Sequence, residues 1–134
     1  MNEIVLPPDW QPFCAATRIP AAVRAGRTVY LSGHAGEGDG GAAPEGLERQ
    51  VRNAFRNMEE TLREAGAAWS DVVQLTSYHV GVRAQMEVVL AVAAELFSGP
   101  LPAWTAVGVA ELFDEGALLD ISAIAVIGET TSAP

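Results

Sequence analysis

The side chains best suited to moving a proton near neutral pH are the two histidines. His34 follows Ser32 and Gly33 at the end of a segment rich in β-formers, and His79 lies within a later one. Since an imidazole titrates close to neutrality, it can serve as a general acid or base. We therefore take His34, with Ser32 beside it, as a candidate catalytic residue. An exposed loop histidine is the plainer interpretation of His34, and a packed interior histidine is the plainer one of His79.

Other kinds of chemistry are excluded or disfavoured by residue type. All eight basic residues are Arg, so the chain has neither a Schiff-base lysine nor the lysine of a Walker-type phosphate loop. The histidines lie far apart with no cysteine or carboxylate at ligand spacing, which predicts no metal site and no cofactor. Residues 36–41 formally fit G-x-G-x-x-G, but Glu37 and Asp39 would repel a pyrophosphate.

Composition narrows the expected partners and compartment. The net charge of −9 disfavours both nucleic acid and anionic membranes, which are bound through positive charge. The single cysteine, Cys14, cannot form an internal disulfide, and no apolar run approaches the roughly 20 residues that span a bilayer. No secretion signal is visible at the N-terminus. We expect a cytoplasmic protein whose partners are a small-molecule ligand and other copies of itself.

The elements that position these residues are predicted from hydrophobic periodicity. We expect one domain over residues 1–134, with an irregular arm at 1–12, a glycine-rich loop at 33–41 and a frayed tail at 130–134. Strands are predicted at 13–19, 28–32, 72–80, 103–110 and 118–127. The first helix carries a stripe of apolar residues at helical spacing: Leu47, Val51, Ala54, Met58, Leu62 and Ala65. The second helix, 83–97, is expected to bury Met86, Val89, Leu90, Ala93 and Leu96 on one face.

This order of elements predicts an α+β fold with both helices on one face of the sheet. The other face would then carry apolar residues that nothing in the chain covers. Exposed apolar patches usually mark interfaces, so self-association is expected.

Four segments, in this order, resemble the Rid family, the YjgF/RidA-like reactive-intermediate (imine) deaminases. They are Val-Tyr-Leu-Ser-Gly at 29–33, Gln-Val-Arg-Asn-Ala at 50–54, the strand at 72–80, and Pro102-Ala103 followed by Ala-Ile-Ala at 123–125. The match covers about residues 26–127. The resemblance implies a chorismate-mutase-like sandwich with a mixed sheet, a homotrimer, and ligand pockets at the subunit clefts.

The resemblance also implies which positions bind substrate, and most of them have changed. Trp104 stands where the deaminases carry the Arg that binds the substrate carboxylate. The other altered positions are Ala106 for a Cys, Ser122 for the Glu that positions water, Leu90 for an Asn, and Phe13 for a Tyr. Gly33 stands where the family has the Gly whose backbone N–H helps to bind a ligand oxygen. Since side chains alternate along a strand, Trp104 and Ala106 share a face, and we expect them to line one surface together with Ser122.

These altered positions suggest a trimer whose pocket binds a different ligand from that of the deaminases. The preferred hypothesis is hydrolysis or tautomerisation of an uncharged or aromatic enamine, imine or enol. Ser32 and the Gly33 N–H would hold an oxygen, His34 would move a proton, and Trp104 would stack on the ligand. Two alternatives stay open. One is a non-catalytic binding or interaction trimer whose cleft is plugged by Trp104. The other is an ordinary 2-imino-acid deaminase that uses Arg18 or Arg24.

Overall fold

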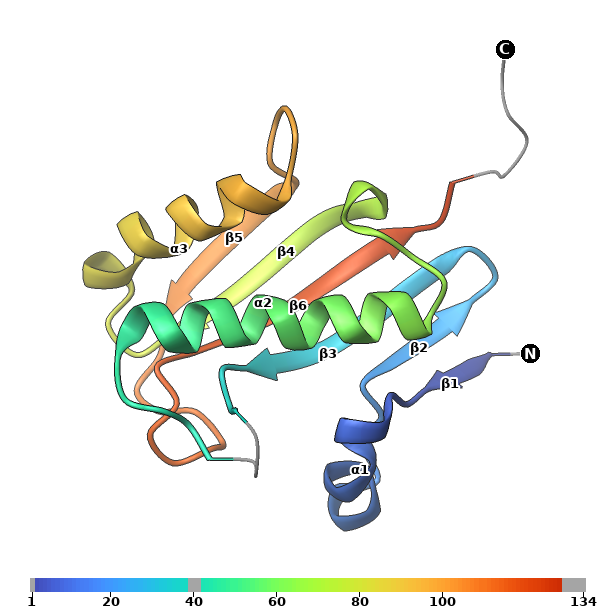
Figure 1. Cartoon of the computed structure of the whole chain (residues 1–134), viewed down its shortest axis with the longest axis horizontal. Coiled ribbons are helices and arrows are strands. Elements are labelled where there is room, and N and C mark those ends of the chain that lie inside the picture. The colour runs from blue at the N-terminus through green and yellow to red at the C-terminus, as the bar shows by residue number, and fades with distance from the viewer. Residues whose placement is uncertain (1, 39–41, 129–134) are drawn as a thin grey trace.

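Six strands form one mixed sheet in the order β1-β2-β3-β6-β4-β5 (Figure 1). The computed structural model describes residues 2–38 and 42–128. The strands are β1 (Glu3–Val5), β2 (Ala22–Ala25), β3 (Thr28–Ala35), β4 (Val72–His79), β5 (Ala103–Gly108) and β6 (Leu119–Val126). All neighbouring pairs are antiparallel except β4 and β5, which are parallel because a helix carries the chain back between them.

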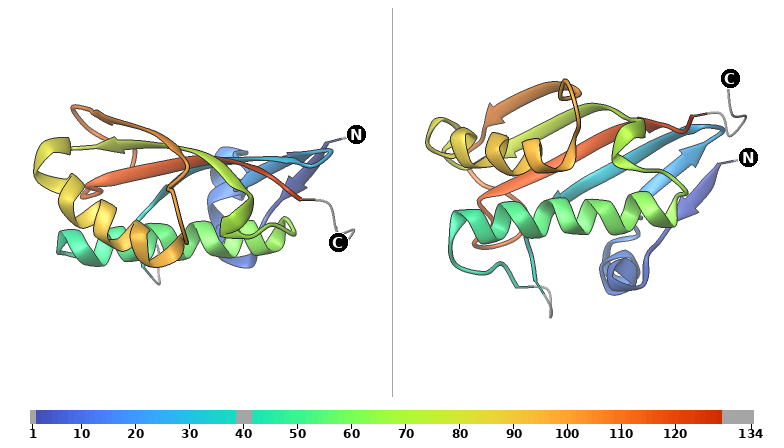
Figure 2. Two further views of the ribbon diagram at one scale, coloured as in Figure 1. Left: turned by 90° about the horizontal axis from the view of Figure 1, so that it is seen from above. Right: turned by 45° about the horizontal axis from the view of Figure 1, so that its top comes forward.

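Two long helices cover one face of this sheet, as the sequence predicts. They are α2 (Leu47–Glu64) and α3 (Val82–Leu96), which lie side by side with the sheet on one side of them only (Figure 2). The short helix α1 (Gln11–Thr17) follows a 3-10 turn, η1 (Pro8–Trp10), and a second such turn, η2 (Trp69–Asp71), precedes β4. The predicted α+β class with a mixed sheet is therefore confirmed. No helix of the described chain is long and apolar enough to cross a membrane.

Strict alternation along β6 shows how the two faces differ. Leu119, Ile121, Ala123 and Ala125 are buried against the helices, while the residues between them are half-buried on the open face. The open face also carries Tyr30, which is 50% exposed. This single chain therefore leaves an apolar sheet face uncovered, as the pattern predicts.

The predicted strand at 13–19 is wrong, because residues 13–17 lie in α1. Pro12 fits the first turn of a helix, where its missing N–H has no partner to lose. The Thr17 hydroxyl donates back to the Phe13 carbonyl at 2.8 Å, and Arg18 ends the helix at a φ of 68°. The first strand is instead β1, inside the segment predicted to be an irregular arm.

Three smaller predictions are corrected or fall outside the described chain. Leu90 lies on the exposed side of α3, 41% accessible, and Gln85 and Val92 take buried positions instead. Gly33, His34 and Ala35 belong to β3, which extends past the predicted start of the loop. The rest of that loop at 39–41 and the tail at 130–134 lie outside the described residues.

Candidate functional site

The residues predicted to form one site fall into separate places in a single copy. Trp104 and Ala106 lie on β5 at the sheet edge, while Ser32 and His34 lie on β3, with β6 and β4 between. Three strand spacings separate β5 from β3 by roughly 14 Å. The exposed Leu90 belongs to α3, on the β5 side of the molecule.

Ser122 faces away from Trp104, so the expectation that they line one surface is wrong within one chain. Leu75 pairs with both Trp104 and Ala123, so these three side chains point toward the helices. Side chains alternate along β6, and Leu119 and Ile121 point toward the helices. Ser122 comes one residue after Ile121 and therefore points to the open face. The alternation predicted along each strand is confirmed. The register that joins β5, β4 and β6 places Trp104 and Ser122 on opposite faces.

Trp104 is held by a chain of buried hydrogen bonds. Its Nε1–H donates to Ser77 Oγ at 2.8 Å, and Ser77 Oγ lies 2.7 Å from His79 Nε2. His79 Nδ1 lies 2.8 Å from Gln85 Oε1. The Gln85 amide N–H groups donate to two backbone carbonyls, so Oε1 must accept from His79 and Nε2 of that ring must accept from Ser77. The indole N–H is thus already used, and the ring packs against the hydrophobic core.

His34 is a buried residue at the end of β3, only 1% exposed, so it is not the exposed loop histidine that was the plainer interpretation. Its Nδ1 donates to the Ser32 carbonyl at 2.7 Å, which leaves Nε2 to accept from the Thr61 hydroxyl at 2.8 Å. Burial lowers the pKa of His34 to about 4, against a smaller opposing effect of the bond to Ser32. Trp10 covers the imidazole at a ring separation of 4.6 Å.

Ser32 is also engaged within its own chain. Its hydroxyl donates to the Pro20 carbonyl at 2.7 Å, which ties β3 to the segment before β2. Gly33 lies where the pairing between β3 and β6 shifts register. A Cβ at Gly33 would collide with the Asp120 carboxylate, so only glycine fits this approach.

A cleft of about 740 Å³ lies between the N-terminal segment and α2. Phe13, a predicted binding residue, lines it together with Trp10 of η1. Its polar lining includes Glu37, Asn57 and Asp114. This volume falls in the range of pockets that hold small ligands.

Glu37 is the titratable group in this cleft with a pKa close to neutrality. The pKa rises to about 7, first because burial disfavours the charged form, then because Asp114 places like charge nearby and hydrogen-bonds to the protonated form, and least because of the charge on Asp120. The pKa of Asp120 is raised by burial and by Asp114 in the same way. One oxygen of each, Glu37 Oε2 and Asp120 Oδ1, is buried without a hydrogen-bond partner among the described residues. Perturbed carboxyl groups of this kind are typical of functional sites.

Two amide side chains on α2 hold the segments that carry Glu37 and Asp114. Asn57 donates to the carbonyls of Ala35 and Glu37, both at 3.1 Å. Gln50 donates to the carbonyls of Pro44 and Gly116 and accepts from the Leu118 N–H, which fixes the loop that bears Asp114.

Glu37 and Asp114 are cleft residues that no local sequence pattern predicts. Gln50 belongs to the segment at 50–54 that was noted for its family resemblance, and its contacts explain why an amide stands there. Glu37 was noted only as a charge that would repel a pyrophosphate. No local signal connects it with Asp114, because the two meet only through the fold.

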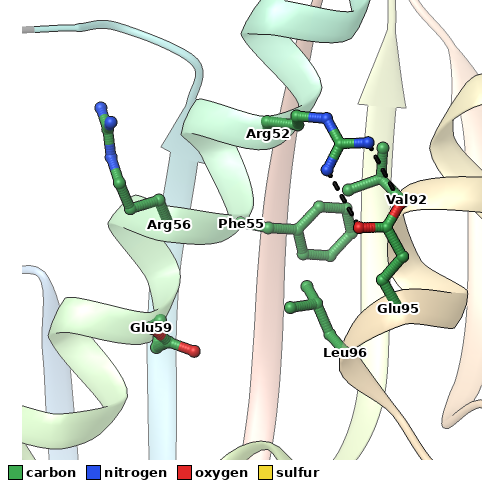
Figure 3. Close-up of a pocket in the computed structure, with 7 residues that line it drawn as sticks. All are labelled: Arg52, Phe55, Arg56, Glu59, Val92, Glu95 and Leu96. Carbon is green, nitrogen blue, oxygen red and sulfur yellow. Dashed lines mark hydrogen bonds and ion pairs between the residues drawn. The ribbon is translucent and has the colours of Figure 1, made fainter.

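A smaller groove of about 140 Å³ runs between α2 and α3 (Figure 3). There Arg52 donates to both oxygens of Glu95, at 3.1 and 3.0 Å, above the buried Phe55. This exposed ion pair spans a normal helix–helix contact. Within residues 2–38 and 42–128, no three His, Cys, Asp or Glu side chains are grouped to hold a metal ion.

Known proteins share this architecture. It combines a mixed sheet with a β4-α3-β5 crossover, an uncovered sheet face and loops held by amide side chains. The family model described as Endoribonuclease L-PSP matches residues 11–127. RutC family protein YjgH of Escherichia coli K12 is 37% identical over 126 residues, which cover 93% of this chain and 95% of that protein. The chain therefore belongs to the Rid family.

Two further similarities show the range of this family. The 2-iminobutanoate/2-iminopropanoate deaminase of Rattus norvegicus is 34% identical over 114 residues, covering 84% of this chain and 82% of the deaminase. A solved structure of protein YjgH superposes with a TM-score of 0.86 at 36% identity, covering 96% of this chain and 98% of that one. The chain is thus related to imine deaminases in sequence, and its fold is that of the family.

Proposed function

We propose that this chain hydrolyses, or tautomerises, a small imine or enamine that lacks a carboxylate. The observation that carries the proposal is Trp104, an uncharged ring whose only polar hydrogen is already donated to Ser77. It stands where the resemblance places a carboxylate-binding Arg. The relationship to deaminases supports the reaction type, and Trp104 supports the change of substrate.

Imine hydrolysis needs one group that moves protons at neutral pH. Water adds to the C=N carbon, the nitrogen takes up protons, and collapse of the adduct releases a carbonyl compound and ammonia. His34 is neutral at pH 7, has both ring nitrogens engaged and lies beneath Trp10. Glu37 lines the cleft with a pKa of about 7 and is therefore the better proton carrier, with His34 positioning Thr61 and β3 around it.

The proposed site is completed by a second copy of the chain. The two groups of predicted residues lie on different sides of one copy, and the open sheet face is apolar. In a homotrimer the β5 edge of one copy, with Trp104, would meet the cleft of the next, with Phe13 and Glu37. This arrangement would bring the two groups of residues together.

Turnover of paired substrates tests the proposal. Imines generated in solution, with and without a carboxylate, are offered to the purified protein and ammonia release is measured. We expect turnover of the carboxylate-free imine and little of 2-iminopropanoate. Trp104→Arg should shift this preference toward the carboxylate. Strong turnover of 2-iminopropanoate by the unaltered protein would contradict the proposal.

The same assay separates the two alternatives. A trimer that neither releases ammonia from any imine nor speeds the tautomerisation of an enamine would support the non-catalytic interpretation, which is favoured by the locked Trp104. The other alternative, an ordinary 2-imino-acid deaminase, depends on Arg18 or Arg24. Arg24 already donates to the carbonyls of Gly26 and Ala65, whereas Arg18 is exposed at the end of α1. Loss of 2-iminopropanoate turnover in Arg18→Ala would support that interpretation.

A further inference from the structure

We propose that the cleft between η1–α1 and α2 binds a small organic cation with an apolar or aromatic body, such as a protonated amine or an iminium. Acidic side chains would hold the charged nitrogen, and the aromatic side chains of the N-terminal segment would cover the body. The choice of an iminium as the natural cation rests on the proposed function, because an iminium is the protonated form of the imine to be hydrolysed.

The charge of the cleft selects a cation. Among the described lining residues four are acidic and one is basic: Asp9, Glu37, Glu60 and Asp114 against Arg56. Arg56 is exposed on the rim, whereas Glu37 is half-buried. An anion would therefore meet uncompensated repulsion inside, and a cation would relieve the mutual repulsion of the carboxylates.

An unsatisfied acceptor supports this choice of ligand. Glu37 Oε2 is buried and has no hydrogen-bond partner in the described chain. Leaving such an atom unpaired is costly, and native structures rarely do so without a reason. An N–H donor on a bound cation would satisfy this oxygen and at the same time compensate its charge.

The apolar wall of the cleft is held in place. Trp10 Nε1–H donates to the Ile19 carbonyl at 3.0 Å, and Trp10 meets Phe13 edge to face at 5.3 Å between ring centroids. Pro7, Pro8 and Pro12 complete this wall. Rigid aromatic faces attract cations and pack well against flat ligands. The acids are not grouped as a metal site within the described residues, so an organic cation fits the cleft better than a metal ion.

Calorimetric titration of the full-length protein at pH 8 tests the inference. The probes are benzylammonium, its uncharged analogue benzyl alcohol, and benzoate. We expect saturable binding of benzylammonium only. The double variant Glu37→Gln/Asp114→Asn should weaken this binding at least tenfold, while Glu115→Gln, an exposed acid on the same loop, should leave it unchanged.

The comparison of probes keeps the inference testable even if the double variant fails to fold, because it uses the unaltered protein. Equal binding of benzyl alcohol, preferred binding of benzoate, or no saturable binding of benzylammonium would each overturn the inference. Benzylammonium binding without turnover of any imine would overturn the proposed function and leave this inference standing. Turnover of an uncharged imine that benzylammonium does not inhibit would do the reverse.

Discussion

Acidification should destabilise this protein through His34, a group the fold keeps neutral. The imidazole is buried, donates to the Ser32 carbonyl and accepts from Thr61, so a proton on Nε2 would force the Thr61 hydroxyl to turn and would place a positive charge out of water. Burial lowers its pKa from 6.5 to about 4. Because the folded pKa lies below the unfolded one, the contribution to stability is complete above pH 6.5 and is lost as the pH falls toward 4.

The size of this effect follows from the two pKa values. Linkage with an unfolded pKa of 6.5 and a folded pKa of about 4 gives a loss of about 2 kcal/mol between pH 7 and 5, and about 3 kcal/mol by pH 4. Glu37 acts in the opposite direction. Its folded pKa is raised, so the stability it contributes is present at low pH and is lost as the pH rises through about 7.

Urea unfolding of the protein and of His34→Gln, from pH 7 to 4 at one protein concentration, isolates the effect. Glutamine can donate and accept in the same place but does not titrate. Glu37 and His79 are present in both proteins, so their contributions cancel in the difference. The advantage of the unaltered protein over the variant should shrink by about 2 kcal/mol at pH 5. A difference that stays constant with pH would refute the reasoning.

Three further substitutions test the contacts around the cleft and the β5 edge. Gln50→Ala removes three buried hydrogen bonds and should lower the free energy of unfolding by about 2–4 kcal/mol in urea titrations, and a loss below 1 kcal/mol would contradict this role. Trp104→Phe keeps an aromatic ring but loses the bond to Ser77 and part of the surface packed against the core, and the same measurement should show a loss of about 1–3 kcal/mol. Gly33→Ala sets a Cβ against the Asp120 carboxylate and should lower the thermal midpoint, so an unchanged midpoint would show that β6 yields easily.

Local patterns predicted α2, α3 and the strands β3 to β6, but they failed at the N-terminal end, where β1, α1 and β2 formed instead of the predicted arm and strand. The stripe from Leu47 to Ala65 and the alternation at 118–127 reflect burial on one side, and both elements formed as expected. The segment 13–19 is short and mildly apolar, so its pattern of side chains fits a strand and a helix almost equally. Contacts of Trp10 with His34 and with the Ile19 carbonyl anchor the helical segment, and these are set by its neighbours in space.

The amino-acid sequence by itself determined the class of fold and the family, because these depend on period and order along the chain. Only the tertiary structure decided that Trp104 and Ser122 lie on opposite faces and that Glu37 and Asp114 share a cleft. Strand register and loop contacts join residues far apart in the chain. Periodicity records which side chains are buried, and the partners they meet are chosen when the sheet assembles.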